Sequence, residues 1–282
     1  MAEFTIKDED LVGVKGKIVV LTGGSSGIGL ATVNLLLSLG ASVVSGDLND
    51  PPETLSGLTF LKTNVTHWTE LVALFKKAIE VHGHIDYVFA NAGIGPRANY
   101  LELETDASGD LKEPNSEAID VMLKGVINTA CLAFHHMKKK PQGCAIVLMG
   151  SSTGLQPLRA ADYSCAKHGV LGFGRGFARL MEAASIPVRI NTLAPSWTST
   201  NVLPDVAGIM QAVSHRSQSP DVVARLTAFL MVDEKRNGEI IFVDDGQYTE
   251  IEKAVLVPAF EKIMGDAPSD DEILRRILSL SG

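Results

Sequence analysis

The feature that most constrains the fold is a glycine-rich turn that joins an apolar run to a helical pattern near the start of the chain. KIVVLTGG, residues 17–24, has the composition of a buried strand, and GIGLATVNLLLSLG, residues 27–40, has apolar residues at helical spacing. Gly23, Gly27 and Gly29 stand at the junction, where glycine lets the backbone turn tightly. A strand that leads directly into a helix is typical of chains that alternate β and α elements.

The same alternation continues to residue 246. Six further strands are expected at residues 41–47, 58–65, 85–93, 144–152, 187–195 and 239–246. Helical patterns lie between them at residues 67–83, 115–139, 161–184 and 219–233. Because strands joined through helices run parallel, the sequence predicts an α/β fold: a single-domain doubly wound parallel sheet, Rossmann-type, with helices on both faces.

Composition and charge exclude several classes of function. The net charge of −8 argues against a nucleic-acid partner, which would require a basic face. The first ten residues, MAEFTIKDED, are too polar and acidic for a targeting signal. No apolar run approaches the length of about 18 residues that a membrane-spanning helix needs. Cys131, Cys144 and Cys165 lack metal-binding or redox spacing, so we expect no metal site and a cytoplasmic protein with reduced thiols.

The glycine-rich turn is expected to bind the pyrophosphate of a dinucleotide, because the N–H groups that begin the helix face an anion there. A turn that merely needs glycine is the alternative. Asp47 ends the second predicted strand, where a carboxylate can accept from a ribose 2′-OH, although it could also be a turn aspartate. A carboxylate would repel a 2′-phosphate, and neither Ser26 nor Leu48 carries a compensating charge. The sequence therefore predicts NAD(H), with NADP(H) disfavoured.

A tyrosine and a lysine share one face of the helix predicted at residues 161–184. Tyr163 precedes Lys167 by four residues, so their side chains lie one turn apart. A phenol in water keeps its proton until roughly pH 10, and a nearby cation lowers that pKa. This spacing alone is usually a solvated helix face, but beside a dinucleotide turn it indicates acid–base chemistry at Tyr163.

These motifs, in this order, resemble those of the short-chain dehydrogenase/reductase family over about residues 15–247. The matching segments are TGGSSGIG at 22–29, Asn64–Val65, NAG at 91–93, YSCAK at 163–167 and PSWTST at 195–200, where Ser196 replaces the family's glycine. The wording of VFANAGI, YSCAKHGVLGF and LAPSWTST is most similar to fungal relatives of 15-hydroxyprostaglandin dehydrogenase.

The resemblance implies a set of cofactor contacts and three catalytic groups. Tyr163 would exchange a proton with the substrate oxygen, Lys167 would lower the pKa of the phenol and hold the nicotinamide ribose, and Ser151 would hydrogen-bond the same oxygen, with Ser152 as the alternative. The implied cofactor residues are Thr22, Gly23, Ser25, Ser26, Gly27, Ile28, Gly29, Asp47, Leu48, Asn64, Val65, Asn91, Ala92, Gly93, Tyr163, Lys167, Pro195, Thr198 and Thr200.

One position departs from the family pattern. Met122 stands where the family has an asparagine that holds a helix irregularity and a water linked to the lysine. Asn128 lies six residues further on and faces elsewhere on a regular helix, so it does not take over this role. The departure supports a rival function, a cofactor-binding protein without redox turnover that acts as a nucleotide sensor or a non-redox cyclisation pocket.

The favoured function is an NAD(H)-dependent oxidoreductase that interconverts a secondary alcohol and a ketone. Substrate contacts are expected from residues 196–218 and from the polar loop at 95–114, because loops after strand ends bind ligands in such folds. The expected apolar walls are Trp197, Val202, Leu203 and Met210. His215 and Arg216 could bind an acidic substrate, but surface positions are favoured for both.

The chain is expected to have three parts and to self-associate. They are an N-terminal extension at 1–14, the dinucleotide-binding and catalytic domain at 15–247, and a helical tail at 248–282. In the tail, Ser269 and Glu272 form a capping box before an apolar stripe, which we expect to pack on the protein's own core; an oligomer contact or a lid is the alternative. The stripe is Ile273, Leu274, Ile277 and Leu278. The long helices at 116–139 and 161–184 resemble those that pair between subunits of this family, so we expect a homodimer or homotetramer.

Overall fold

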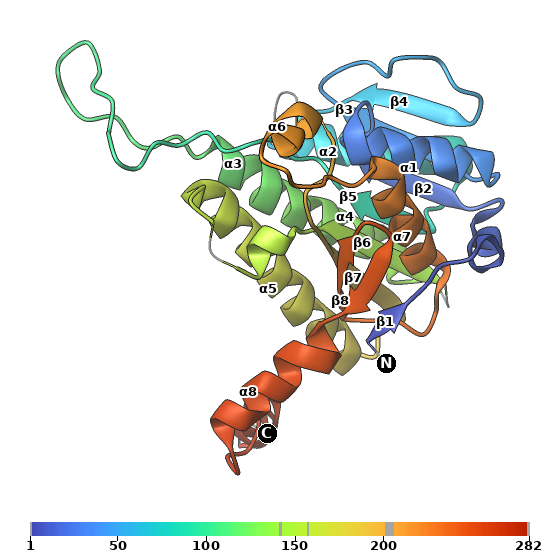
Figure 1. The fold of residues 1–282 in the computed structure, drawn as a ribbon. Coiled ribbons are helices and arrows are strands. Elements are labelled where there is room, and N and C mark those ends of the chain that lie inside the picture. The colour runs from blue at the N-terminus through green and yellow to red at the C-terminus, as the bar shows by residue number, and fades with distance from the viewer. Residues whose placement is uncertain (1, 141–142, 157, 201–205, 281–282) are drawn as a thin grey trace.

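A nine-stranded sheet with helices on both faces forms the body of the protein (Figure 1). The structure is a computed structural model that describes residues 2–140, 143–156, 158–200 and 206–280. The strands are β1 (Glu3–Phe4), β2 (Ile18–Thr22), β3 (Ser42–Asp47), β4 (Leu58–Lys62), β5 (Tyr87–Ala90), β6 (Cys144–Met149), β7 (Val188–Pro195), β8 (Ile240–Asp244) and β9 (Gln247–Glu250). Their order in the sheet is β1-β9-β8-β7-β6-β5-β2-β3-β4.

The order of the strands reverses at β2. This strand pairs in parallel with β3 on one side and with β5 on the other, and every pairing from β4 to β8 is parallel. In open α/β sheets the crevice at such a reversal, beyond the carboxyl ends of the strands, is the usual ligand site. The doubly wound parallel sheet predicted from the sequence is confirmed.

Two apolar cores lie on opposite faces of the sheet. The pleat of β2 sends Val20 into one core and Val19 and Leu21 into the other, as expected for a strand buried on both faces. The first core is closed by α2 (Trp68–His82), α4 (Gly125–Met137) and α5 (Ala161–Ala183). The second is closed by α1 (Gly27–Ser38) and α7 (Pro220–Val232).

The helix that precedes β6 is irregular. It consists of α3 (Glu117–Ile119), a π-helical turn (Asp120–Lys124) and α4. Among the described residues, the stretch Glu117–Met137 is long and apolar enough to cross a membrane by length and composition alone, and 44% of its apolar window is buried. The stretch is not an unbroken apolar run, because polar residues such as Lys124 and Asn128 interrupt it. A core helix passes the same test, and α4 lies in the first core.

Both ends of the chain add strands to the sheet. β1, within the expected N-terminal extension, pairs antiparallel with β9, and β9 pairs antiparallel with β8. The expected N-terminal extension and the expected tail thus each supply residues to a strand beside the predicted central domain, Glu3–Phe4 and most of Gln247–Glu250. β1 has two residues and β9, QYTE, is mostly polar, so neither gives the apolar run by which the other strands were predicted.

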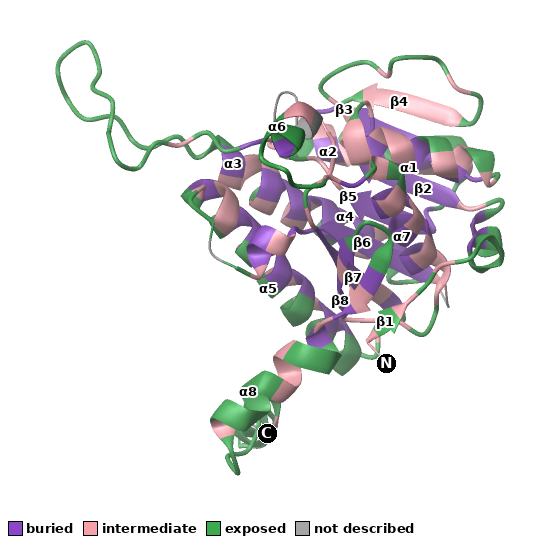
Figure 2. Ribbon diagram, in the orientation of Figure 1, coloured by how far each residue is buried: buried purple, intermediate pink, exposed green. Residues whose placement is uncertain are grey.

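The C-terminal helices α8 (Val257–Met264) and α9 (Asp270–Ser279) extend away from the sheet, and their surfaces are largely exposed (Figures 1 and 2). Ser269 caps α9 as expected, accepting from the Glu272 N–H, whereas the Glu272 carboxylate pairs with Arg275 and Arg276. The prediction that the apolar stripe packs on the protein's own core was wrong: Ile277 and the other stripe residues are exposed. An amphipathic pattern identifies a face of a helix but not what covers it.

Candidate functional site

A cleft of about 610 Å³ opens at the carboxyl ends of β2, β3, β5, β6 and β7. It is bordered by the glycine-rich turn at one side and by α5 at the other. The expected site residues that border it are Gly23, Ser26, Gly27, Ile28, Gly29, Asp47, Leu48, Asn64, Val65, Asn91, Ala92, Gly93, Ser151, Ser152, Tyr163, Lys167, Pro195, Thr198 and Thr200. Thr22 and Ser25 are not among the residues that border it.

The turn between β2 and α1 requires glycine for two different reasons. Gly23 has a φ of +74°, and a Cβ there would lie 2.8 Å from the Cα of Ala92. A Cβ at Gly29 would collide with the carbonyl oxygen of Gly23. The backbone therefore lies bare at the start of α1, where its N–H groups suit a phosphate. This cradle fits the pyrophosphate of a dinucleotide.

Asp47 is fixed where β3 ends, facing the turn. One carboxylate oxygen accepts from the N–H of Ser25 at 3.0 Å, and the other accepts from the N–H of Asn49 at 3.0 Å. Ser25 Oγ in turn donates to the carbonyl of Asn49 at 2.7 Å. Ser25 thus acts on the site by holding Asp47, and each carboxylate oxygen keeps lone pairs for a ligand hydroxyl.

The end of β5 is tied to the turn by Asn91. Its Nδ2 donates to the carbonyls of Thr22 and Gly23 at 3.1 and 2.9 Å, and its own N–H donates to Thr22 Oγ1 at 3.2 Å. Thr22 lies behind the turn, and its role there is to join two strands. The neighbouring Asn64 accepts from the N–H and the hydroxyl of Thr66, which holds the wall of the cleft at the end of β4.

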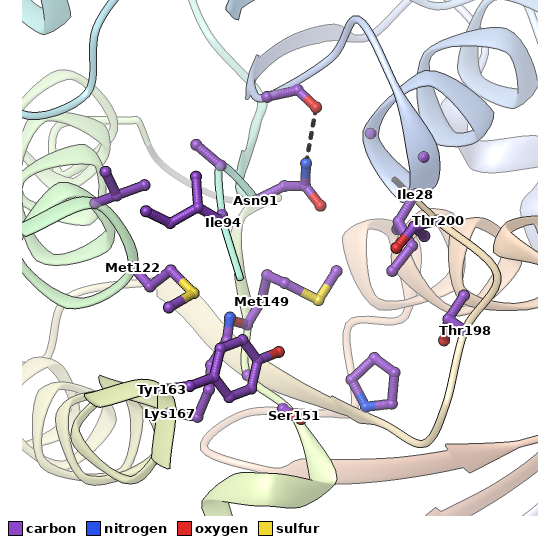
Figure 3. Close-up of a pocket in the computed structure, with 18 of the residues that line it drawn as sticks. Ile28, Asn91, Ile94, Met122, Met149, Ser151, Tyr163, Lys167, Thr198 and Thr200 are labelled. Carbon is purple, nitrogen blue, oxygen red and sulfur yellow. Dashed lines mark hydrogen bonds between the residues drawn. The ribbon is translucent and has the colours of Figure 1, made fainter. Parts of the chain in front are cut away.

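Tyr163, Lys167 and Ser151 converge on the other side of the cleft (Figure 3). Lys167 Nζ lies 5.6 Å from the centre of the Tyr163 ring and donates to the carbonyl of Met149 at 2.9 Å. Ser151 Oγ accepts from the Thr153 N–H at 3.1 Å, so its own hydrogen remains available for donation. Ser152 borders the same cleft.

Burial is the main cause of the shifts in the pKa values of Lys167 and Tyr163. It lowers the pKa of Lys167 to about 8, because a charged ammonium is poorly solvated there. Burial raises the pKa of Tyr163, and a hydrogen bond with Ser151 lowers it only in part. The pKa of the phenol therefore shifts opposite to the direction implied by the family resemblance. The contact that Lys167 makes is with the Met149 carbonyl and the ring face.

Met122 is fully buried in the π-helical turn of the long helix. It packs with Ala118 and Ala166, against Ile94 and Tyr163. The helix irregularity is thus present with methionine at the position where the family has asparagine. An apolar thioether next to Tyr163 leaves no amide at this point to hold a water for Lys167.

The expected substrate residues are only partly brought together. Trp197 borders the cleft, whereas the buried Met210 does not. Val202 and Leu203 lie outside the described residues. His215 is exposed, and the exposed Arg216 pairs with Asp245 at 3.1 Å. Both residues therefore lie on the surface, as the sequence favoured.

The expected polar loop contributes less to the cleft than its length indicates. Of residues 95–114, Pro96 borders the cleft, Arg97 and Ala98 are hydrogen-bonded to Asp162, and the later part of the loop extends away from the body of the protein (Figure 1). This extended part carries an isolated antiparallel bridge between Thr105 and Leu111.

Sequence reasoning missed two buried residues that shape the cleft. Asp162 accepts from the N–H groups of Arg97 and Ala98 at 2.7 and 3.0 Å, tying the loop after β5 to the residue before Tyr163. Burial alone would raise the pKa of Asp162, but these hydrogen bonds outweigh it and lower the pKa. Gln218 hydrogen-bonds the segment after β7. Neither residue belongs to a local pattern, since its partners are distant in sequence.

Comparisons with known proteins identify the family. The family model described as short chain dehydrogenase matches residues 17–208. The short-chain dehydrogenase/reductase ascJ of Acremonium egyptiacum is 45% identical, with 100% of this chain and 97% of that protein covered. The short-chain dehydrogenase/reductase prx4 of Penicillium rubens is 34% identical, with 90% and 82% covered.

A solved structure agrees at the level of the fold. The 3-ketoacyl-(acyl-carrier-protein) reductase from Brucella melitensis, complexed with NADH, superposes with a TM-score of 0.71 at 23% identity. The match covers 83% of this chain and 98% of that one. The chain belongs to the short-chain dehydrogenase/reductase family and is an oxidoreductase of the NAD(P)-dependent kind.

Proposed function

We propose that the protein is an NAD(H)-dependent oxidoreductase that interconverts a secondary alcohol and a ketone, with Tyr163 as the general acid/base. The observation that carries the proposal is a single cleft that joins the glycine cradle and Asp47 at one side to Tyr163, Lys167 and Ser151 at the other. A bound nicotinamide would supply or accept the hydride, and the protein would supply position and protons.

In this mechanism the residues of the cleft bind the substrate oxygen and exchange one proton with it. Ser151 donates its hydrogen to the substrate oxygen, while its Oγ accepts from the Thr153 N–H, which holds the hydroxyl in place. Tyr163 gives the proton that converts the nascent alkoxide to an alcohol, and it takes that proton back in the oxidation direction. Lys167, with its pKa lowered to about 8 by burial, can resupply the proton at neutral pH.

On the Tyr163 side of the cleft, the wall formed by residues that the structure describes suits a neutral, apolar substrate. Its apolar members are Ile94, Pro96, Val121, Met122, Leu158, Ala160 and Trp197. Among the described residues that border the cleft, Lys167 is the sole cation, and it is buried. Glu117 on the rim pairs with Arg97 at 3.4 Å. A carboxylate or phosphate on the substrate would therefore meet little compensating charge in this part of the wall.

Cofactor preference is expected to depend on Asp47. NADH should bind more tightly than NADPH, because a carboxylate accepts from a 2′-OH and repels a 2′-phosphate. A hydrogen bond to a charged group contributes about 1.5–3 kcal/mol, so Asp47→Ala should reduce the NADH/NADPH affinity ratio by roughly 10- to 100-fold. Isothermal titration of both forms measures this ratio. Lys62 lies opposite Asp47 in the register of β3 and β4.

Asp50→Ala is the matched control, since Asp50 is exposed and does not border the cleft. It should leave the affinity ratio as it is in the wild type. Equal or tighter binding of NADPH by the wild-type protein would contradict the assignment of Asp47 to the ribose.

Met122 is expected to slow proton resupply. Met122→Asn should raise kcat more than it changes KM, because an amide beside Tyr163 can hold a water where the thioether does not. The measurement is steady-state kinetics across pH for both forms, with a solvent isotope comparison. A lower or unchanged kcat in a variant that is folded by circular dichroism would count against this relay.

We further propose that the protein is a homodimer or homotetramer paired through its long helices. On α5, the positions that a side chain at Gly172 or Gly176 would fill are open, whereas Gly169 and Gly174 face Leu123 and Thr192. Close approach of a second copy would therefore involve Gly172 and Gly176, and not all four glycines.

A double variant tests this contact. Gly172→Glu with Gly176→Glu should yield monomers by light scattering at micromolar concentration, because two carboxylates cannot be buried in a close helix contact without a partner. Ala73→Glu, on the exposed face of α2, should stay oligomeric. A monomeric wild type would refute the proposal.

The redox proposal itself is tested by following the absorbance of NADH while neutral apolar ketones are offered. We expect oxidation of NADH with at least one ketone, and little with matched substrates that carry a carboxylate. NADH consumption that requires an anionic substrate would contradict the assignment of the apolar wall.

A further inference from the structure

Gln218 is a buried amide with all of its polar atoms engaged. The residue is 3% exposed and lies between α6 (Val206–Ala212) and α7. Its Oε1 accepts from the N–H of Asp245 at 3.1 Å, and its Nε2 donates to the carbonyl of Val243 at 3.1 Å. These backbone partners fix the orientation of the amide, because an N–H only donates and a carbonyl only accepts.

The same Nε2 group reaches the segment that follows β7. It lies 3.2 Å from Ser196 Oγ and 3.2 Å from Thr198 Oγ1. Three acceptors share two hydrogens, so at least one hydrogen is bifurcated. Ser196 Oγ also donates to Asp244. Ser196 stands where the family pattern has glycine, so its hydroxyl adds to this network a contact that a glycine lacks.

The backbone of Gln218 is also hydrogen-bonded to the segment that follows β7. Its N–H donates to the carbonyl of Trp197 at 2.8 Å, and its carbonyl accepts from the N–H of Ser199 at 2.9 Å. Thr198 and Gln218 therefore form a parallel bridge. Backbone groups alternate in direction along an extended segment, so the N–H and the carbonyl of Thr198 point away from Gln218. Thr198 itself borders the cleft.

We propose that Gln218 is a positioning residue for cofactor binding, which fixes residues 196–199 in the shape that closes the nicotinamide side of the cleft. The proposal rests on the proposed function, because it assigns this side of the cleft to the nicotinamide. It follows from the sheet: β7 pairs with β6, which ends just before Ser151, whereas β3, which ends in Asp47, lies beyond β2. Residues 196–199 continue from the end of β7 and cross the cleft toward Ile28, beside which Thr198 lies (Figure 3). Gln218 is not itself a residue of the cleft wall.

The test compares two ligands that differ at one end. ADP-ribose has the adenine, both riboses and the pyrophosphate of NADH but no nicotinamide. In Gln218→Met, which keeps the length of the side chain and removes its hydrogen bonds, NADH affinity should fall by about tenfold or more by isothermal titration. ADP-ribose affinity should remain close to that of the wild type. The KM for NADH should rise with a smaller change in kcat.

Two further variants keep the proposal falsifiable if Gln218→Met folds poorly. Ser196→Gly combined with Thr198→Val removes two acceptors of the amide without changing Gln218, and it should also weaken NADH selectively. Gln247→Met is the matched control, since Gln247 is exposed on β9 and outside the cleft. It should bind both ligands as the wild type does.

The outcomes separate this inference from the function on which it rests. An equal loss of NADH and ADP-ribose affinity would show a general structural role, and unchanged affinity for both would show no role; either result overturns the positioning proposal. If wild-type protein bound NADH no more tightly than ADP-ribose, the nicotinamide side would contribute nothing, which also overturns it. If wild-type protein bound neither ligand, the proposed function itself would fail.

Discussion

Replacing Tyr163 with phenylalanine should reduce turnover by about 10²- to 10⁴-fold, the range that general acid–base catalysis contributes, while NADH affinity stays close to that of the wild type. The ring would remain in place beside Ala118, Met122 and Ala166, and only the hydroxyl would be lost. The measurement is kcat/KM with the best ketone, together with titration of NADH.

Tyr100→Phe provides the matched control for this experiment. Tyr100 lies on the extended polar loop, is 47% exposed and does not border the cleft, so the same loss of a hydroxyl should leave turnover unchanged. Substantial residual activity in Tyr163→Phe would exclude Tyr163 as the proton donor and would move the assignment to another group in the cleft.

Replacing Lys167 with methionine should remove turnover and at the same time stabilise the protein without cofactor near pH 7. Burial lowers the pKa of Lys167 from 10.5 to about 8, which at 1.36 kcal/mol per pKa unit is a cost of about 3 kcal/mol for the buried ammonium. The lost hydrogen bond to the Met149 carbonyl offsets about 1 kcal/mol. The net gain in the free energy of unfolding is then about 2 kcal/mol.

The pH dependence gives this second prediction a definite sign. Because the pKa of Lys167 is lower in the folded than in the unfolded state, the unfolded chain binds more protons between pH 8 and pH 10.5. The wild-type free energy of unfolding should therefore rise, relative to Lys167→Met, as pH increases through this window. Denaturant unfolding of both forms at pH 7 and above pH 10 measures this difference in the free energy of unfolding. If the variant were more stable than the wild type by the same amount at both pH values, the buried-charge account would be contradicted.

The fold was predictable because its signals are local. Gly23, Gly27 and Gly29 between an apolar run and a helical pattern indicate one strand–turn–helix unit, and repeats of that unit require a parallel sheet. The carboxyl ends of parallel strands share an edge, so Asp47 and Asn91, at the ends of β3 and β5, border one cleft in the structure. This geometry follows from the sheet.

Other features depend on partners that no local pattern records. Gln218 and Asp162 are defined by hydrogen bonds to backbone groups 20 or more residues away. β1 and β9 are ordered by pairing with neighbours and not by periodicity. The pKa of Tyr163 depends on burial, which the spacing to Lys167 does not reveal. The apolar stripe of α9 is exposed, and nothing in the described part of the chain covers it.

The central claim is that this cleft transfers a hydride between NADH and a ketone, and transfer of an isotope label tests it most directly. Wild-type protein and Tyr163→Phe would each be incubated with neutral apolar ketones and NADH deuterated at the transferring position, and products would be analysed by mass spectrometry. We expect an alcohol carrying one deuterium on its carbinol carbon from the wild type, and almost none from the variant. Cofactor bound by both proteins, with no deuterated alcohol from any ketone, would contradict the account and favour a cofactor-binding protein without redox turnover.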